Sequence, residues 1–444
     1  MAYPERRLNL FDATMIVSGA IIGAGIFINP AESARFLESS SQVLFVWTLA
    51  GVIAFLGGLC FAELGSLFLH SGGQYIYFEK AFSPGVGFLF GWTLFTTIQT
   101  GAIAAVAMTC ARFLATFIPL SEKGSVFAAA AIIWFLSFVN FLGIRPGSLV
   151  QNIFTVLKIA SLAGLVVVCF LLRPPPGGAF AFGPLFPSGF NLSLGRNLGL
   201  ALMPALFSYG GWQNLNFVAG EVRNPKRTLP LAIMAGVSLV VVVYILTNLV
   251  YVSTLPFAAI KSSNRVAADA GQALLGSSGS RLIAAAIVIS TFGITNVFIL
   301  TGPRVYQAMA EQGAFLSLAR KLHPRYQSPY FSIFLQSAWA SILLFTNTYS
   351  QLLQYVTFGD WIFFGLAALA LIVLRRRLPP QPDAYRVQLY PFIPVLFALI
   401  SFAVVLNVFM ASPQKSLLGI GIILGGWPLY ALTKKKNREK SDEN

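Results

Sequence analysis

The sequence predicts an all-α membrane protein that crosses the bilayer twelve times, and two observations carry this prediction. Of its 444 residues, 56% are hydrophobic and only 10% are charged, with a mean hydropathy of +0.74. Soluble domains carry about 25% charged residues, so this composition excludes a soluble enzyme and a disordered chain. The apolar residues form continuous runs and do not alternate with polar ones, which indicates spanning helices and not barrel strands.

The apolar runs follow one another along a single transmembrane domain that covers residues 1–444. A helix needs about 20 apolar residues to span a bilayer, and twelve runs come near that length. The first run follows two arginines and has no small-residue cleavage site behind it, so we expect a retained helix and not a signal peptide. The runs lie near residues 9–36, 42–69, 84–117, 124–143, 148–172, 197–220, 228–253, 281–311, 330–347, 351–374, 390–411 and 416–433.

The positive charges are unevenly shared between the loops, and this predicts the orientation. The chain has 30 Lys and Arg against 15 Asp and Glu, a net charge of +15. With the N-terminus in the cytoplasm, 20 of the basic residues fall on the inner side, 9 on the outer side, and Lys158 lies inside a run. The positive-inside rule then predicts a multi-pass protein of the plasma (inner) membrane with both termini cytoplasmic. Nucleic acid is not needed as a partner to explain the charge.

Glycine motifs lie in the middle of the first and sixth runs. The first run contains Ile21-Ile22-Gly23-Ala24-Gly25-Ile26-Phe27, and the sixth contains Phe207-Ser208-Tyr209-Gly210-Gly211-Trp212. Glycine weakens a helix by about 1 kcal/mol relative to alanine. Small residues also serve close helix packing, and for either motif alone that alternative stays open.

The spacing of the two motifs favours a pair of broken helices. They lie five runs apart, as a five-plus-five inverted repeat would place them. We expect the first repeat in 1–172, the second in 197–374, two additional helices in 390–433 and a cytoplasmic tail in 434–444. Both motifs lie roughly 20 Å deep at 1.5 Å per residue, near the middle of a hydrocarbon core of about 30 Å. A break at that depth exposes N–H groups that suit a carboxylate and carbonyl groups that suit an ammonium, which predicts a site for an α-amino acid.

Lys158 lies in the fifth run, roughly 15 Å from its inner end at 1.5 Å per residue. A lysine at the centre of a membrane helix costs about 2.5–3.5 kcal/mol on insertion scales, so we expect it to have a structural or functional role. One interpretation is a structural lysine that caps a neighbouring helix carbonyl. The other is a fixed cation beside the broken first helix, in the place that a coupling sodium ion would take. Loss of its proton on burial leaves proton coupling open as well.

Four further polar residues in the runs have weaker assignments. Glu63 lies near the inner end of the second run, and we expect it to pair with a cytoplasmic arginine. Asp360 lies deep enough in the tenth run to line a cavity. Asn296 in the eighth run and Tyr244 in the seventh either face the bundle interior or serve packing.

No set of side chains points to catalysis, a metal or a cofactor. The two histidines are far apart in sequence and no paired acidic motif occurs, so we do not expect an enzyme. The cysteines lie inside apolar runs and form no CxxC pair, which argues against a disulfide framework and a zinc site. A channel is the remaining alternative to a carrier, and a gated central site argues against it.

Four motifs resemble one family of transporters. Residues 22–27 resemble the first-helix signature of the amino acid–polyamine–organocation superfamily, and FAELG at 61–65 with SGGQY at 71–75 resembles its second helix and re-entrant segment. The stretch FSYGGWQNLNFVAGEVRNPKRTLP at 207–230 is similar to the L-type amino acid transporter branch, as is STFG at 290–293. The motifs stand in the family's order and spacing, and the resemblance covers the first ten runs.

The resemblance implies a LeuT-type fold and sodium-independent exchange of L-amino acids. It implies that the first motif holds the substrate carboxylate, that the second meets the amino group and side chain, and that Phe207 acts as an outer gate. Lys158 stands where the family's lysine ties helix 1 to helices 5 and 8. The candidate substrate contacts are Ile21, Gly23, Ala24, Gly25, Phe207, Ser208, Gly210, Asn296, Tyr244 and Asp360.

Three departures from the family pattern shape the expected function. Ala24 replaces a common serine, and Asp360 stands where a neutral residue is expected, which could favour small polar or cationic substrates. The outer loop at 118–124 has no cysteine, where eukaryotic relatives bond a glycoprotein subunit, so no disulfide-linked subunit is expected. We expect an exchanger of small to medium neutral amino acids that works by alternating access. The alternatives are a proton-coupled symporter and an exchanger for cationic amino acids or polyamines, and the oligomeric state stays open.

Overall fold

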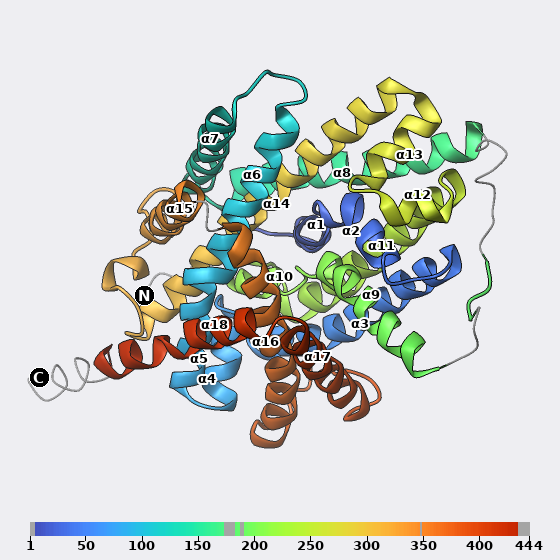
Figure 1. The fold of residues 1–444 in the computed structure, drawn as a ribbon. Helices are drawn as coiled ribbons and strands as arrows, with labels where there is room; N and C mark the ends of the chain where they lie inside the picture. Colours follow the sequence, from blue (N-terminus) through green and yellow to red (C-terminus); the bar gives the residue numbers. More distant parts are fainter. Residues whose placement is uncertain (1–4, 173–182, 187–190, 347–348, 434–444) are drawn as a thin grey trace, which may run out of the picture.

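The computed structural model describes residues 5–172, 183–186, 191–346 and 349–433. Within these ranges the regular structure is helical, apart from one isolated β-bridge between Leu8 and Val222 (Figure 1). The elements are α1 (Leu10–Ile21), α2 (Gly25–Ala34), α3 (Ser40–Leu67), α4 (Gln74–Ala81), α5 (Pro84–Thr93), the π-helix η1 (Leu94–Ile98), α6 (Gln99–Leu114), α7 (Glu122–Phe141), α8 (Ile144–Leu172), α9 (Leu192–Tyr209), α10 (Asn214–Phe217), η2 (Ala219–Glu221), α11 (Pro225–Thr254), α12 (Phe257–Ser262), α13 (Val266–Leu275), α14 (Ser277–Glu311), η3 (Ser317–Arg320), α15 (Tyr330–Phe345), α16 (Tyr349–Arg377), α17 (Phe392–Ala411) and α18 (Pro413–Leu424).

Polar residues at the ends of the apolar runs start several of these helices. Asn9 accepts a hydrogen bond from the Asp12 amide, and the Asp12 side chain accepts one from the Asn9 amide, which forms a capping box for α1. Ser39, Ser83 and Ser121 cap α3, α5 and α7 in the same position. A capping side chain satisfies one of the amides that the first turn leaves without a partner, so it marks where the chain enters the helix.

The structure supports ten of the twelve predicted membrane spans. Nine helices of the described ranges are long and apolar enough to cross a membrane, and the pair α1 and α2, bent by 41° at its break, makes a tenth. The all-helical, multi-span class is therefore confirmed. The run at 197–220 overlaps α9, which ends at Tyr209, and the run at 330–347 contains α15, which has only 16 residues. Twelve spans and the inverted repeat remain predictions.

The helices enclose the interrupted first span. Figure 1 shows α1 and α2 near the centre of the bundle, with α6 and α14 on one side and α9 and α10 on the other. Helix α1 packs against α8, α11 and α14, and α2 packs against α9. Because α1 contacts protein and not lipid along most of its length, the polar groups exposed at its break have side chains within reach.

Two ion pairs tie helices together at the end of the bundle that is predicted to be cytoplasmic. Glu63 on α3 receives hydrogen bonds from Arg375 on α16, at 2.7 Å from Nη2 to Oε2, so the expected pairing of Glu63 with an arginine is confirmed. Arg304 on α14 donates from Nε to Glu221 Oε1 at 2.7 Å, and both side chains are almost fully buried. The Glu221 carbonyl also accepts hydrogen bonds from the amides of Arg7 and Leu8, which brings the N-terminal segment to this pair.

The substitution Glu221→Ala is expected to destabilise the protein strongly. It leaves the Arg304 guanidinium buried without its partner, and breaking a buried pair from one side costs about 3–5 kcal/mol. The midpoint of thermal unfolding in detergent, followed by size-exclusion chromatography, measures this loss. Asp383→Ala is the matched control because its pair with Lys226 is exposed and worth less than about 1 kcal/mol. Equal shifts of the midpoint for the two variants would contradict the assignment.

Candidate functional site

The two helix breaks lie directly against each other. Gly211, just after α9, has a φ of +127°, and a Cβ added there would lie 2.5 Å from the Ala20 carbonyl oxygen and 3.1 Å from the Ile21 amide nitrogen. A Cβ added at Gly25 would lie 2.5 Å from Ser208 Oγ. Only glycine allows both the backbone conformation and this approach. The glycine motifs therefore interrupt the two helices and also let the interruptions meet.

Side chains from two helices, α8 and α14, hold carbonyl groups at the end of α1. Lys158 on α8, only 1% exposed, donates from Nζ to the carbonyls of Gly19 at 2.8 Å and Ile22 at 2.9 Å. Ser290 on α14 donates to the Ile22 carbonyl at 3.1 Å. Carbonyl groups that lose their helical partner inside a membrane must find another donor. The structural interpretation of Lys158, a cap on a neighbouring helix, is thus what the contacts show.

Tyr244 on α11 contacts the backbone at both helix breaks. Its hydroxyl lies 3.0 Å from the Ile21 carbonyl oxygen and 3.3 Å from the Ser208 carbonyl oxygen. It is fully buried and does not line the cavity described below. Tyr244 was a candidate substrate contact, but in the structure it contacts the backbone of α1 and α9 and not the cavity.

The amide groups at the start of α2, unlike the carbonyl groups at the end of α1, have no side-chain partner at the helix cap. The N-cap residue Ala24 makes no side-chain cap, and the first amides of a helix have no acceptor within the helix itself. These amides also carry the positive end of the helix dipole, which makes a helix start a binding site for anions. Gly23, Ala24 and Gly25 all border a cavity, so a ligand in this cavity would lie next to the start of α2.

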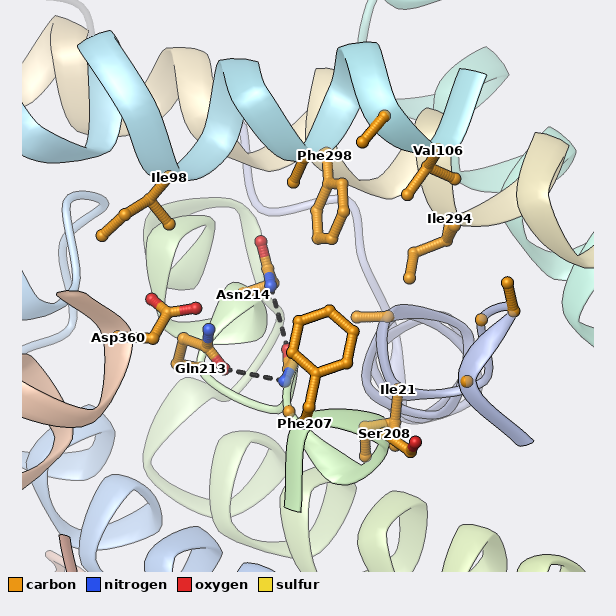
Figure 2. Close-up of a pocket in the computed structure, with 18 of the residues that line it drawn as sticks. Ile21, Ile98, Val106, Phe207, Ser208, Gln213, Asn214, Ile294, Phe298 and Asp360 are labelled. Atoms are coloured by element: carbon orange, nitrogen blue, oxygen red, sulfur yellow. Dashed lines mark hydrogen bonds between the residues drawn. The ribbon is translucent and has the colours of Figure 1, made fainter. Parts of the chain in front are cut away.

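This cavity has an empty volume of about 1060 Å³, including the part open to solvent, and Figure 2 shows its lining. Phe207 is 42% exposed, and its ring projects into the middle of the space (Figure 2). The structure brings together eight of the ten candidate substrate contacts in this lining, namely Ile21, Gly23, Ala24, Gly25, Phe207, Ser208, Gly210 and Asp360.

Asn296 is not among the residues that line the cavity. Its Nδ2 donates to the Gly147 carbonyl at 3.0 Å, and its Oδ1 accepts from Asn140 Nδ2 at 2.9 Å. It therefore links α14 to α7 and α8, away from the helix breaks. The sequence showed that Asn296 is polar and inside a span, but the side of the helix on which it lies depends on packing.

Three amide side chains in the cavity lining were not anticipated from the sequence. Asn214 Nδ2 donates to the Gly211 carbonyl at 3.0 Å, and the Gly211 amide donates to Gln213 Oε1 at 3.1 Å (Figure 2). Gln99 Nε2 donates to the Phe298 carbonyl at 3.0 Å, next to Thr301. Gln213 and Asn214 directly follow the second glycine motif, and Gln99 is a polar residue inside an apolar run, so both signals were available.

Asp360 on α16 contributes the one ionisable side chain to the lining of this cavity. Its carboxylate lies beside Ile98 and Gln213, across the cavity from the first helix break (Figure 2). The described residues contain no group of three His, Cys, Asp or Glu side chains able to hold a metal ion. The arrangement of amides, carbonyls and one carboxylate around a cavity that is partly open to solvent is suited to binding a polar small molecule inside a membrane.

A multi-span helical bundle with a cavity of this kind at two broken helices is the architecture of a membrane transporter. The amino acid permease family model matches residues 8–425. The chain belongs to this family, within the L-type branch of the amino acid–polyamine–organocation superfamily, which confirms the resemblance of its motifs. It is thus a transporter and not an enzyme, as the sequence predicted.

Curated relatives match nearly the whole chain. It is 34% identical to the human b(0,+)-type amino acid transporter 1 over 96% of this chain and 88% of the relative. It is 31% identical to the serine/threonine exchanger SteT of Bacillus subtilis over 97% of this chain and 98% of that protein. It is 30% identical to the human cystine/glutamate transporter over 96% and 85% of the two chains.

The substitution Gly211→Ala is expected to disrupt the site, because the new Cβ would meet the backbone of Ala20 and strain a positive φ. We expect a lower midpoint of thermal unfolding in detergent and loss of amino acid transport in proteoliposomes. Gly195→Ala is the control: no atom lies within 4 Å of its added Cβ, and alanine in a helix is favoured by about 1 kcal/mol. A Gly211→Ala protein as stable and active as the control would contradict the proposed contact between the breaks.

Proposed function

We propose that this protein exchanges small to medium neutral L-amino acids across the membrane without sodium, by alternating access. The observation that carries the proposal is that the two sides of the first helix break differ in their hydrogen-bond partners. The Gly19 and Ile22 carbonyls are held by protein donors, whereas the start of α2 borders the cavity and has no capping side chain. A ligand with a carboxylate is what the amides at this helix start lack.

The remaining parts of a zwitterion also find partners in the cavity. The substrate carboxylate binds the amides that begin at Gly23 to Gly25. The ammonium lies near the carbonyls of Ile21 and Ser208, because each carbonyl oxygen has a second lone pair beyond its contact with Tyr244. Ala24 and the adjacent glycines leave room for the backbone, and the side chain extends past Phe207. This arrangement recognises the feature that all α-amino acids share.

The position of Lys158 supports transport that is independent of sodium. Hard cations are bound by carbonyl and hydroxyl oxygens, and such oxygens gather here at Gly19, Ile22 and Ser290. The Lys158 ammonium is already in contact with the two carbonyls. A fixed positive charge there performs the structural task of a bound sodium ion, so transport does not need one.

Alternating access is supported by the difference between the two ends of the bundle. The cavity extends from the breaks along α6 to Val106 and Thr109, in the half that the charge distribution assigns to the outside. At the other end the Leu8 bridge to Val222 and the Arg304 pair with Glu221 hold separate segments of the chain together. We propose that α1, α2, α9 and α10, with α3 and α11, rock against a scaffold of α5, α6, α7, α14 and α15.

The other features of the proposal follow the sequence predictions. We place the protein in the plasma (inner) membrane with both termini in the cytoplasm, twelve spans, and an inverted repeat of 1–172 and 197–374. The cysteines Cys60, Cys110 and Cys169 are all buried, in keeping with a protein that has no disulfide-linked subunit. The named substrates of the relatives, including serine and threonine, make neutral amino acids the first class to test.

Exchange is tested with the purified protein in proteoliposomes. Uptake of radiolabelled serine is expected to rise severalfold when the lumen contains unlabelled serine, because the carrier returns faster when occupied. Replacing external sodium by choline is expected to leave the rate unchanged. Uptake that ignores internal serine but follows an imposed pH gradient would contradict exchange and support the proton-coupled symporter.

Lys158→Ala is expected to abolish exchange while the protein still inserts into the membrane. Without the ammonium, the Gly19 carbonyl loses the one side-chain donor that the structure gives it, and leaving a buried acceptor unsatisfied costs about 1–3 kcal/mol. Serine exchange, normalised to the amount of inserted protein, measures the effect. Lys415→Ala removes an exposed lysine and is expected to behave as the unsubstituted protein. Exchange at the full rate in Lys158→Ala would overturn the role of this residue.

A further inference from the structure

Asp360 lies where the side chain of a bound amino acid would end. It lines the cavity from α16, and the start of α2 lines it from the other side. Figure 2 shows its carboxylate across the space from Ile21, with Phe207 and Asn214 between them. A substrate that places its carboxylate on the α2 amides therefore directs its side chain past Phe207 toward Asp360. This placement rests on the proposed function of the cavity.

No fixed positive charge faces this carboxylate. In the part of the chain that the structure describes, Asp360 has neither a hydrogen-bond donor nor an ion-pair partner, and no other ionisable side chain lines the cavity. Lys158 is turned to the carbonyls of Gly19 and Ile22. The helices packed against α16 carry few titratable side chains, none of which lines the cavity: Cys60 and Glu63 on α3, Tyr75, Tyr77, Glu79 and Lys80 on α4, Cys110 and Arg112 on α6, and Lys415 on α18.

The nearest polar group is an amide and not a cation. Gln213 Oε1 accepts the hydrogen bond of the Gly211 amide, which leaves its amide nitrogen to donate toward the cavity beside Asp360 (Figure 2). The basic residue Arg375 on the same helix lies 15 residues away, or roughly 22 Å at 1.5 Å per residue, and it is bound to Glu63. An ionised carboxylate held inside a membrane without a counter-charge is strongly unfavourable. A proton, or a cation that the ligand brings, relieves this cost.

We propose that Asp360 compensates the charge of the substrate: it holds a proton when a neutral amino acid occupies the cavity, and it binds the cationic side chain of a lysine-like amino acid when ionised. The occupied site carries the same total charge in both cases. Exchange of external serine for internal lysine then brings one proton in with serine, taken from the outer solution, and sends one positive charge out with lysine. The cycle is electroneutral and acidifies the lumen.

The wild-type protein tests this balance in proteoliposomes that contain lysine and a pH-sensitive dye. Added external serine is expected to acidify the lumen by one proton for each lysine released, at a rate that does not respond to a potassium–valinomycin potential. Lysine–lysine and serine–serine exchange are expected to move no net protons. Lysine–serine exchange that moves no protons and follows the membrane potential would overturn the proposal. So would a protein that exchanges serine but not lysine, which leaves the proposed function intact.

The substitution Asp360→Asn removes the charge of this side chain and keeps its size, so it tests the carboxylate alone. We expect lysine uptake to fall at least about tenfold, equivalent to a loss of about 1.4 kcal/mol in binding. The rate of serine–serine exchange is expected to lose its dependence on pH, whereas Asp360→Glu keeps both the lysine uptake and the pH dependence. Asp383→Asn, which removes an exposed acid, is the matched control.

Two results would count against Asp360 in these variants. One is lysine uptake by Asp360→Asn at the wild-type rate, and the other is a pH profile of serine exchange equal to that of Asp383→Asn. Thermal unfolding in detergent shows whether Asp360→Asn is folded, and if it is not, the proton count of the wild-type protein decides. Absence of any serine exchange by the wild-type protein would instead overturn the proposed function itself.

Discussion

The constraint on which this structure depends is that no backbone polar group can be left unpaired inside a membrane. The chain breaks two helices in its interior and has to satisfy the groups that each break releases. Gly211 packs against the Ala20 backbone, which brings the two breaks together. The Tyr244 hydroxyl therefore lies within hydrogen-bond distance of a carbonyl from each break, those of Ile21 and Ser208.

The two sides of the first break differ in their hydrogen-bond partners, and this difference creates the candidate site. Lys158 and Ser290 hold the Gly19 and Ile22 carbonyls, so these two groups already have protein donors. The start of α2 has no capping side chain and borders the cavity. Helix starts attract anions through their amides and dipole. In the proposed function, peptide groups recognise the substrate backbone, and Asp360 on the opposite wall of the cavity responds to the substrate side chain.

Much of the fold could be predicted because its signals are local. Continuous apolar runs have only one stable form in lipid, and paired glycines inside such runs weaken the helix at a definite place. The pairing of Glu63 with an arginine was predictable for the same reason, since an acid at the end of a span needs a counter-charge. The short helix α15 and the interrupted α9 show the limit, because length and hydropathy alone do not identify them as spans.

The sequence by itself determined the membrane class, the family and the positions of the two breaks, because these follow from composition and from residues adjacent in the chain. Only the tertiary structure decided which polar side chains reach the cavity. Asn296 and Tyr244 support the backbone from outside the cavity, whereas Gln99, Gln213 and Asn214 line it. The direction in which a polar residue of a spanning helix points depends on how that helix is rotated against its neighbours. That rotation is set by packing between segments far apart in the sequence.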